Sequence, residues 1–365
     1  MPSRTSLSSS PGDGPIVVDK FGGSVLRRAD DIVGAVEAVA EQVADGQRPV
    51  VVVSAFEGVT DAILAAAATI LPDGGAILRG TRLDAAEPLA RETDRALTTG
   101  EALSAALFAL GLQARGIPAR SFSGAEAGIR TAAAHLGAEV RRVAPRRLRV
   151  ALAERLVPVV AGFQGVGAHG ELTTLGRGGT DLSAVVLAAA LRADHCALFK
   201  DTGGIMEADP HLVPAAGFLP SVDALQLELL AELGAEVVHP VAVRRARRAR
   251  LRLVVRALAA DRPMTEVLPR PPRGGPAGGP MLAVDRKGRI ARLSLVGPRE
   301  AMPELLPVPA HGAGSFDESG LRVVWADVPL DQVASAARAI HASCMGAAAR
   351  PRESAQPHSA QPPPA

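Results

Sequence analysis

Three glycine-containing segments carry residue types that could bind an anion. In the first, Lys20, Gly22, Gly23 and Ser24 directly follow a short β-branched run, and a helix is expected a few residues later. Two glycines let backbone N–H groups approach an anion closely, and a lysine adds a point charge for a phosphate. Because the lysine precedes the glycines, the segment is not a Walker A loop. It predicts either a phosphate-binding loop or an ordinary tight turn between a strand and a helix.

The second segment spans residues 172–191. A glycine-rich turn surrounds Arg177 and leads into Thr180 and Asp181, which can cap an alanine-rich helix. The N–H groups at the start of a helix and its dipole favour an anion there, and an arginine can grip a carboxylate with two hydrogen bonds. The alternative is a capped turn with a purely structural role.

The third segment starts at Lys200 and Asp201, where an expected strand opens into a loop with glycines. Active sites of open α/β sheets lie at such strand ends. Of the 40 basic residues only Lys20, Lys200 and Lys287 are lysines. A lysine kept in so arginine-rich a chain points to a need for a compact ammonium group, although chance is the alternative.

Short β-branched runs alternate with helical patterns along most of the chain. The expected strands are residues 16–19, 50–54, 157–162, 197–200 and 252–255. The expected helices are residues 29–44, 101–113, 181–192 and 222–233. This alternation predicts a mostly parallel sheet that is covered by helices on both faces.

Composition changes mark the expected domain boundaries. Residues 1–14 and 346–365 are low-complexity and are expected to be disordered tails, and residues 261–280 form a Pro/Gly-rich linker. Beyond the linker, residues 281–345 form a small module, with strands expected at 289–296 and 321–325 and a helix at 330–343.

Composition also excludes several classes of protein. The chain has 365 residues, 47% of them hydrophobic and 21% charged, as expected for a folded globular protein. A net charge of +2 and 2% aromatic residues argue against nucleic-acid and membrane partners. No apolar run reaches the ~18 residues of a membrane span, and the N-terminus has no signal-peptide pattern. Two cysteines exclude a disulfide framework. We expect a cytoplasmic enzyme.

Two stretches are dense in arginine: residues 141–150 hold five and residues 243–256 hold seven. Such runs are found where proteins bind RNA or other anionic surfaces. With few aromatic residues for base stacking, solvated helix faces are the favoured interpretation.

Together the three segments and their surroundings resemble the aspartate kinases of the amino-acid-kinase superfamily. The resemblance runs in order over eight segments, which are DKFGGS (19–24), VVVSAFEGVTDAIL (51–64), TTGEALSAAL (98–107), SFSGAEAGIRT (121–131), VVAGFQGV (159–166), TTLGRGGTD (173–181), DTGGIMEADPHLVP (201–214) and ELGAEVVHPVAV (232–243). It implies an α/β fold: a three-layer amino-acid-kinase domain with a mostly parallel central sheet over residues 15–260. Residues 281–345 faintly resemble one reduced α+β ACT-like module, where aspartate kinases usually carry two.

The resemblance implies a phosphotransferase with a carboxyl group as acceptor. Aspartate kinases use ATP and Mg²⁺ to convert L-aspartate into 4-phospho-L-aspartate, the first step toward amino acids such as lysine and threonine, and usually form homodimers. Two alternatives remain open: a kinase for another small amino-acid carboxylate, and a non-catalytic regulatory homologue.

The resemblance also assigns roles to individual residues. Lys20 would contact the phosphoryl group in flight, and Asp201 would organise this lysine and the metal; no residue is assigned as a dedicated metal ligand. Glu101 would pair with the substrate ammonium and Arg177 with its α-carboxylate. The residues expected to bind ATP or its phosphates are Lys20, Phe21, Gly22, Gly23, Lys200, Asp201, Met206, Asp209 and Pro210. Those expected to bind the substrate are Ser54, Thr60, Glu101, Arg130, Thr131, Arg177, Gly178, Gly179 and Thr180.

The nucleotide side departs from the family pattern. Gly203 replaces an aspartate, Met206 a tyrosine, His211 an arginine and Glu236 a lysine. We hypothesise that Lys200 replaces the lost phosphate-binding cation. The expected chemistry needs no general base, because a carboxylate with a reference pKa of about 4 is already ionised at neutral pH.

Overall fold

The computed structural model describes residues 14–71, 87–235, 237–259, 261–269 and 278–344. The chain divides into two compact units. The first comprises residues 1–206 and 217–278, and the second comprises residues 207–216 and 279–365. The chain therefore leaves the first unit at residue 207 and returns to it at residue 217. Nearly all of the predicted tails lie outside the described residues.

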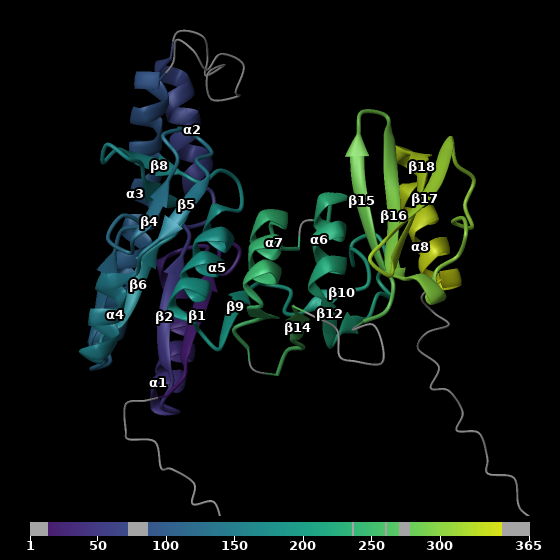
Figure 1. The fold of residues 1–365 in the computed structure, drawn as a ribbon. Coiled ribbons are helices and arrows are strands. Elements are labelled where there is room, and N and C mark those ends of the chain that lie inside the picture. The colour runs from purple at the N-terminus through teal and green to yellow at the C-terminus, as the bar shows by residue number, and fades with distance from the viewer. Residues whose placement is uncertain (1–13, 72–86, 236, 260, 270–277, 345–365) are drawn as a thin grey trace, which may run out of the picture. The chain divides into compact units, whose positions relative to one another are not determined.

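An eight-stranded sheet forms the centre of the first unit (Figure 1). Its order is β12-β14-β13-β9-β1-β2-β6-β3, and its neighbours pair in parallel except β13 and β14. The strands are β1 (Ile16–Phe21), β2 (Arg48–Val53), β3 (Ala119–Phe122), β6 (Val157–Ala161), β9 (His195–Phe199), β12 (Ser221–Asp223), β13 (Arg252–Arg256) and β14 (Thr265–Leu268). The five strands that the sequence predicts are all present, and the mostly parallel sheet is confirmed.

Helices cover both faces of this sheet, which confirms the three-layer prediction. The helices are η1 (Ala29–Asp31), α1 (Ile32–Ala44), α2 (Val59–Ile70), α3 (Glu87–Ala114), α4 (Arg146–Ala153), α5 (Gly179–Leu191), α6 (Ala224–Glu232) and α7 (Pro240–Ala249). On one face α1 and α3 bury Phe21 together with Val36 and Phe108. On the other face α5 packs on β1 and β9, with α7 beside it. Because successive side chains of β1 point to opposite faces of the sheet, Lys20 points to the face covered by α5, whereas Asp19 and Phe21 point to the other face.

A smaller sheet accompanies α3. Its order is β5-β4-β7-β8, built from β4 (Ile129–Thr131), β5 (Val140–Val143), β7 (Gln164–Val166) and β8 (Leu172–Thr174). A short ribbon pairs β10 (Ile205–Met206) with β11 (Phe218–Leu219), on either side of the segment 207–216.

The second unit is a small α+β module, as predicted. Its antiparallel sheet has the order β15-β16-β18-β17. The elements are β15 (Met281–Lys287), β16 (Ile290–Pro298), η3 (Arg299–Ala301), β17 (Gly312–Glu318), β18 (Leu321–Pro329), η4 (Leu330–Gln332) and α8 (Val333–Cys344). Helix α8 packs on β16 and β18. A sheet with one covering helix is consistent with the ACT-like module that the resemblance implies.

The segment 207–216 is bonded to this second unit. The Leu282 N–H donates to the carbonyl of Glu207 at 2.7 Å, and Nε2 of His341 on α8 lies 3.0 Å from Oε2 of Glu207. A guanidinium N–H of Arg338 donates to the carbonyl of Leu212 at 3.4 Å.

Three expectations about local structure need correction. The stretch 261–280, expected to be a linker, contains β14, because the short apolar run around Val267 pairs with β13 and β12 despite its proline-rich flanks. Helix α3 begins at Glu87 rather than 101. Residues 221–223 form strand β12, and the helix expected from 222 begins only at Ala224, where Asp223 caps it by accepting from two backbone N–H groups.

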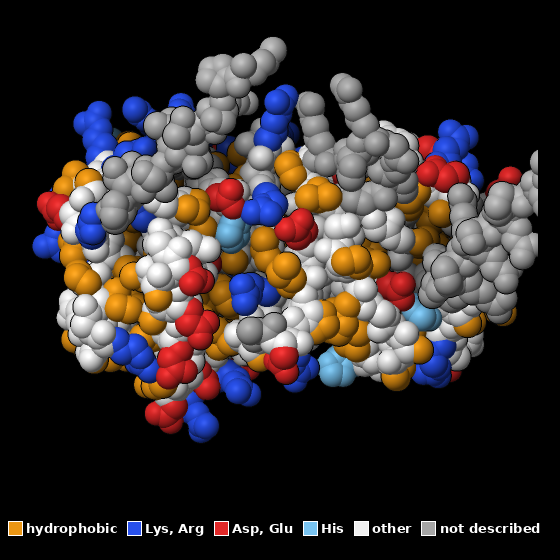
Figure 2. All heavy atoms as spheres, turned by 90° about the horizontal axis from the view of Figure 1, so that it is seen from below, with side chains coloured by type: hydrophobic (Ala, Val, Ile, Leu, Met, Phe, Trp, Pro, Cys, Tyr) orange, Lys and Arg blue, Asp and Glu red, His pale blue; other side chains and the backbone are white. Residues whose placement is uncertain are grey.

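The surface agrees with the near-neutral composition. On the face drawn in Figure 2, basic and acidic side chains of the described residues are interspersed. Among those residues, no helix combines the length and apolar character needed to span a bilayer.

Candidate functional site

Two lysines and one aspartate meet at the carboxyl ends of β1 and β9. Nζ of Lys20 lies 2.6 Å from Oδ1 of Asp181, and Nζ of Lys200 lies 3.6 Å from Oδ2 of the same carboxylate. Lys20 and Asp181 are each 5% exposed, whereas Lys200 is half-buried. Parallel strands β1 and β9 are neighbours, so their ends bring two residues 180 positions apart into one cluster.

The charges of this cluster are strongly coupled. Burial alone would raise the pKa of Asp181, but the two lysines and hydrogen bonds from Lys20 and the backbone of His239 outweigh it and hold the pKa at about 2. Burial lowers the pKa of Lys200, and the nearby charge of Lys20 acts in the same direction against the attraction of Asp181. With all three groups charged, the cluster keeps a net positive charge that suits a phosphate.

Two glycines make room for this arrangement. A Cβ on Gly22 would lie 2.6 Å from Nζ of Lys20, so a larger residue would displace the ammonium group. Gly178 has φ +68° and lies against the ring of His239, so a Cβ there would collide with the imidazole. Both the lysine position and the turn before α5 therefore require glycine.

Glu101 is a second buried charge site. It lies on α3, is 3% exposed, and its Oε1 accepts a hydrogen bond from the Ala55 N–H at 3.1 Å. Its Oε2 is buried and has no hydrogen-bond partner among the described residues. Burial raises the pKa of this carboxyl to about 7, although the Ala55 bond favours the ionised form. A cationic ligand would supply the partner that Oε2 lacks.

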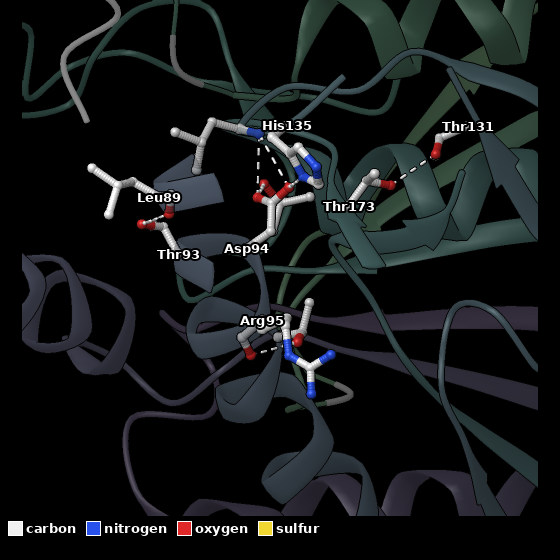
Figure 3. A network of polar contacts seen from close by, with 10 residues as sticks. Leu89, Thr93, Asp94, Arg95, Thr131, His135 and Thr173 are labelled. Atoms are coloured by element: carbon white, nitrogen blue, oxygen red, sulfur yellow. Dashed lines mark hydrogen bonds and ion pairs between the residues drawn. The ribbon is translucent and has the colours of Figure 1, made fainter. Parts of the chain in front are cut away.

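Helix α3 carries a buried polar stripe that includes this glutamate. Asp94, Thr98 and Glu101 are spaced by four and three residues, so they lie on one helix face, and all three are buried. Asp94 anchors the small sheet (Figure 3): Nδ1 of His135 lies 2.7 Å from its Oδ2, and the Thr174 hydroxyl donates to its Oδ1 at 2.6 Å. These contacts fix the segment after β4 to the helix that carries Glu101.

The predicted substrate residues differ in how deeply they are buried. Glu101 and Thr180 are buried. Ser54, directly after β2, and Thr60, in the first turn of α2, are half-buried. Arg177 is exposed between Gly176 and Gly178, which both have positive φ. Arg177 has no ion-pair partner among the described residues.

Arg130 and Thr131 do not share an environment. Thr131 is buried, and its hydroxyl lies 2.8 Å from that of Thr173 (Figure 3). Arg130, the residue before it on β4, is exposed and lines a hollow with other arginines. Successive strand residues point to opposite faces, so the two cannot serve one site on the same face of the small sheet.

The predicted nucleotide residues are also divided. Met206 ends β10 in the first unit, whereas Asp209 and Pro210 belong to the segment 207–216 of the second unit. His211 is exposed, and its N–H donates to Oδ1 of Asp209 at 2.9 Å. Gly203 is buried with φ +85°, a conformation that disfavours the aspartate of the family pattern. Glu236 lies outside the described residues.

The partner of Lys20 differs from the one expected. The resemblance gave the orienting role to Asp201, but Asp181 forms the ion pair and the side chain of Asp201 is exposed. Asp181 was expected only to cap α5 together with Thr180. Helix α5 instead begins at Gly179, with Gly178 as its cap and no side-chain cap bond, so Asp181 is the third residue of the helix. Asp94, His135 and His239 were not foreseen; the only signal for Asp94 was its helical spacing from Glu101.

Comparisons with known proteins identify the family of the chain. The amino acid kinase family matches residues 15–257. Aspartokinase of Mycolicibacterium smegmatis is 40% identical over 253 residues, which are 69% of this chain and 57% of that protein. Aspartokinase of Thermus thermophilus is 39% identical over 252 residues, which are 69% of this chain and 59% of that protein. The chain thus spans somewhat more than half the length of these curated relatives.

Solved structures show the same fold. Aspartate kinase from Synechocystis is 32% identical, with a TM-score of 0.60 over 89% of this chain and 54% of that chain. E. coli aspartokinase III in complex with aspartate and ADP has a TM-score of 0.71 over 90% of this chain and 99% of that chain; at 20% identity it speaks for the fold alone. The resemblance to aspartate kinases is confirmed, and the chain belongs to the amino acid kinase family.

Proposed function

We propose that this protein is an aspartate kinase, which transfers the γ-phosphoryl group of ATP to the side-chain carboxylate of L-aspartate. The observation that carries the proposal is the buried cluster of Lys20, Asp181 and Lys200 at the strand ends, with Glu101 as a second buried charge. Relatives named aspartokinase at about 40% identity support the choice of acceptor.

The reaction requires that the acceptor carboxylate is aligned with the γ-phosphoryl group and that the negative charge of the phosphates is neutralised. The acceptor carboxylate is ionised at neutral pH and can attack the phosphorus without a base. Negative charge spreads over the oxygens of the transferring group, so cations fixed beside it lower the barrier. Lys20 is the cation best suited to this role, because its buried ion pair with Asp181 fixes the ammonium group before substrates bind.

Lys200 supplies a second cation at the same carboxylate. This position supports the hypothesis that it replaces the phosphate-binding lysine of the family pattern, since its Nζ approaches Asp181 from β9. The substrate would be held at its other end: Oε2 of Glu101 would accept from its ammonium, and Arg177 would pair with its α-carboxylate.

Magnesium fits this site as an ion carried by the phosphates. Among the described residues no three acidic, histidine or cysteine side chains converge on one point. A phosphate-bound Mg²⁺ needs only one or two protein carboxylates, and the exposed Asp201 beside Lys200 is the residue that would hold it. When bound, the ion would neutralise charge on the phosphates.

We also predict a homodimer, because the aspartate kinases that the chain resembles usually form one. Light scattering would measure the oligomeric state.

An acceptor panel tests the function. Purified protein is incubated with ATP, Mg²⁺ and hydroxylamine, which traps acyl phosphates as hydroxamates, together with L-aspartate, L-glutamate, D-aspartate or succinate. We expect hydroxamate from L-aspartate at a kcat/KM at least a hundredfold above the other acids. A different preferred acid would assign the site to another carboxylate. Absence of product with all acids, together with undetectable ATP binding, would indicate a non-catalytic homologue.

A further inference from the structure

An arginine-lined hollow of about 480 Å³ lies in the first unit. Its lining includes Arg130 on β4, Arg142 on β5, Arg146 and Arg147 at the start of α4, and a single carboxylate, that of Glu126. Three of the five arginines in the stretch 141–150 therefore converge on one concave surface, where a fourth joins them from β4. Arg142 lies on β5 and the other two lie on α4, so the exposed arginines of this stretch do not all belong to one helix face.

Two of these arginines lie next to each other although their like charges repel. Arg130 and Arg142 are directly opposite each other in the antiparallel register of β4 and β5, so their side chains share one face. Like charges in this position destabilise a sheet. Both side chains are exposed, and neither has an ion-pair partner among the described residues.

The start of α4 adds to the positive charge. Arg146 and Arg147 lie in its first turn, which contains no acidic residue, although a helix N-terminus favours negative charge. Glu126 is already engaged: its Oε1 accepts from Arg147 at 3.3 Å, and its Oε2 accepts from the Ser123 hydroxyl at 2.9 Å. One carboxylate faces four guanidinium groups, so the hollow holds a strong positive excess that an anionic ligand would relieve.

The hollow is distinct from the candidate catalytic site. Thr131, which follows Arg130 on β4, points into the protein and bonds Thr173, and alternation along the strand sends Arg130 to the opposite face. The volume suits a small molecule, and no aromatic side chain lines the hollow to stack nucleic-acid bases.

We propose that this hollow binds a small molecule with at least two phosphate groups. Guanidinium groups bind phosphate oxygens with paired hydrogen bonds, and two phosphates carry enough charge to neutralise the excess. The proposal concerns a second site and does not depend on the reaction at Lys20.

Inorganic pyrophosphate is the probe, measured by calorimetry and thermal unfolding at constant ionic strength. Arg142→Gln tests the hollow. Arg141→Gln is the matched control, because Arg141 is the preceding β5 residue and already pairs with Glu139 at 3.1 Å. Lys20→Ala removes binding at the catalytic cluster. Citrate tests whether carboxylates suffice, and sodium chloride tests a general salt effect.

We expect 1 mM pyrophosphate to raise the Tm of wild type, Arg141→Gln and Lys20→Ala by about 2–4 °C. Arg142→Gln should weaken pyrophosphate binding at least tenfold and, without ligand, unfold at or above the wild-type Tm, because like-charge repulsion is relieved. Equal binding by Arg142→Gln, loss of binding in Lys20→Ala alone, or an equal shift with sodium chloride or citrate would overturn the proposal.

Discussion

At the scale of single residues, Asp181 determines how the two lysines can act. Its carboxylate lies between Lys20 and Lys200, and without it two ammonium groups would repel each other in a mostly buried space. The lysines would then turn toward solvent or lose a proton. Asp181 therefore acts in the proposed reaction as a positioning residue for Lys20.

Asp181→Asn should lower kcat by about 100-fold, because Lys20 loses its fixed position while the side-chain shape is kept. Steady-state kinetics measures this loss, and circular dichroism checks the fold. Asp201→Asn is the matched comparison and should cost much less. A larger loss from Asp201→Asn would return the orienting role to the residue that the sequence favoured.

Glu101 should make aspartate binding depend on pH. Its carboxyl, with a pKa raised to about 7 by burial, must ionise to pair with an ammonium group. The kcat/KM for aspartate should therefore fall about tenfold per pH unit below pH 7 and level off above pH 8. In Glu101→Gln the kcat/KM for aspartate should be low at every pH and should no longer depend on pH in this range. An unchanged pH profile in that variant would exclude Glu101 as its source.

The sequence predicted which lysines join the candidate site better than it predicted the residue that pairs with them. Lys20 and Lys200 stood out because lysine is rare and both follow strands. The role of Asp181 was missed because a helix-start aspartate suggests a cap, and only the packing of α5 on β1 turns it toward Lys20. The resemblance assigned both Arg130 and Thr131 to the substrate, although Arg130 is exposed and Thr131 is buried.

At the scale of elements, β1 carries a charged residue on each face. Lys20 faces α5, while Asp19 is fully buried on the side covered by α1 and α3. Burial raises the pKa of Asp19 to about 7, against smaller effects of Gln42 and Arg256 in the other direction. Because this carboxyl is buried in a central strand, it either stays protonated or its charge destabilises the folded protein.

Asp19 should make the protein less stable as the pH rises. Its pKa is higher in the folded chain than the ordinary 3.8, so the stability it contributes is present at low pH and is lost as the pH rises toward 7. Between pH 5.5 and 8 this amounts to about 2 kcal/mol of unfolding free energy. Urea unfolding of wild type and Asp19→Asn at both pH values measures it. Equal pH dependence in the two proteins would contradict this prediction.

Element boundaries were predicted well where periodicity was uniform and poorly where it was interrupted. The five predicted strands of the large sheet each contain a short apolar run, and their positions agree to within two residues. The first half of α3 was missed because its face carries buried polar residues such as Asp94 and Thr98, which break the apolar pattern. Strand β14 was missed because prolines flank a run of only four residues.

At the scale of the whole molecule, the chain passes from one unit to the other three times. The segment 207–216 carries Asp209 and Pro210, which the resemblance assigns to ATP, yet its contacts are with β15 and α8 of the second unit. Contacts within the second unit therefore fix the segment whose residues the resemblance assigns to ATP.

His341→Ala should raise the KM for ATP at least threefold and leave the KM for aspartate unchanged, because the contact with Glu207 is lost. His341→Gln keeps a hydrogen-bond donor and should restore most of the affinity. Ser343→Ala, at an exposed position of α8, is the control. Trp325, the only tryptophan, reports whether the second unit stays folded. Parallel changes in both KM values would contradict a role confined to the nucleotide side.

Feedback by lysine or threonine should be weak. The second unit supplies one reduced module within the described residues, whereas aspartate kinases that the chain resembles usually carry two. Millimolar lysine or threonine should change the activity less than twofold in a steady-state assay. A tenfold loss of activity would show that single modules pair to build an effector site.

The most direct test of the account compares wild type, Lys20→Ala and Lys287→Ala in the hydroxamate assay with ATP, Mg²⁺ and L-aspartate. Lys287 is the matched control, because it is an exposed lysine of the second unit that pairs with Asp285. We predict hydroxamate from wild type and Lys287→Ala, and at least a thousandfold loss in Lys20→Ala. Equal rates in Lys20→Ala and wild type, or no hydroxamate from wild type, would contradict the central claim that the Lys20 cluster transfers phosphate to aspartate.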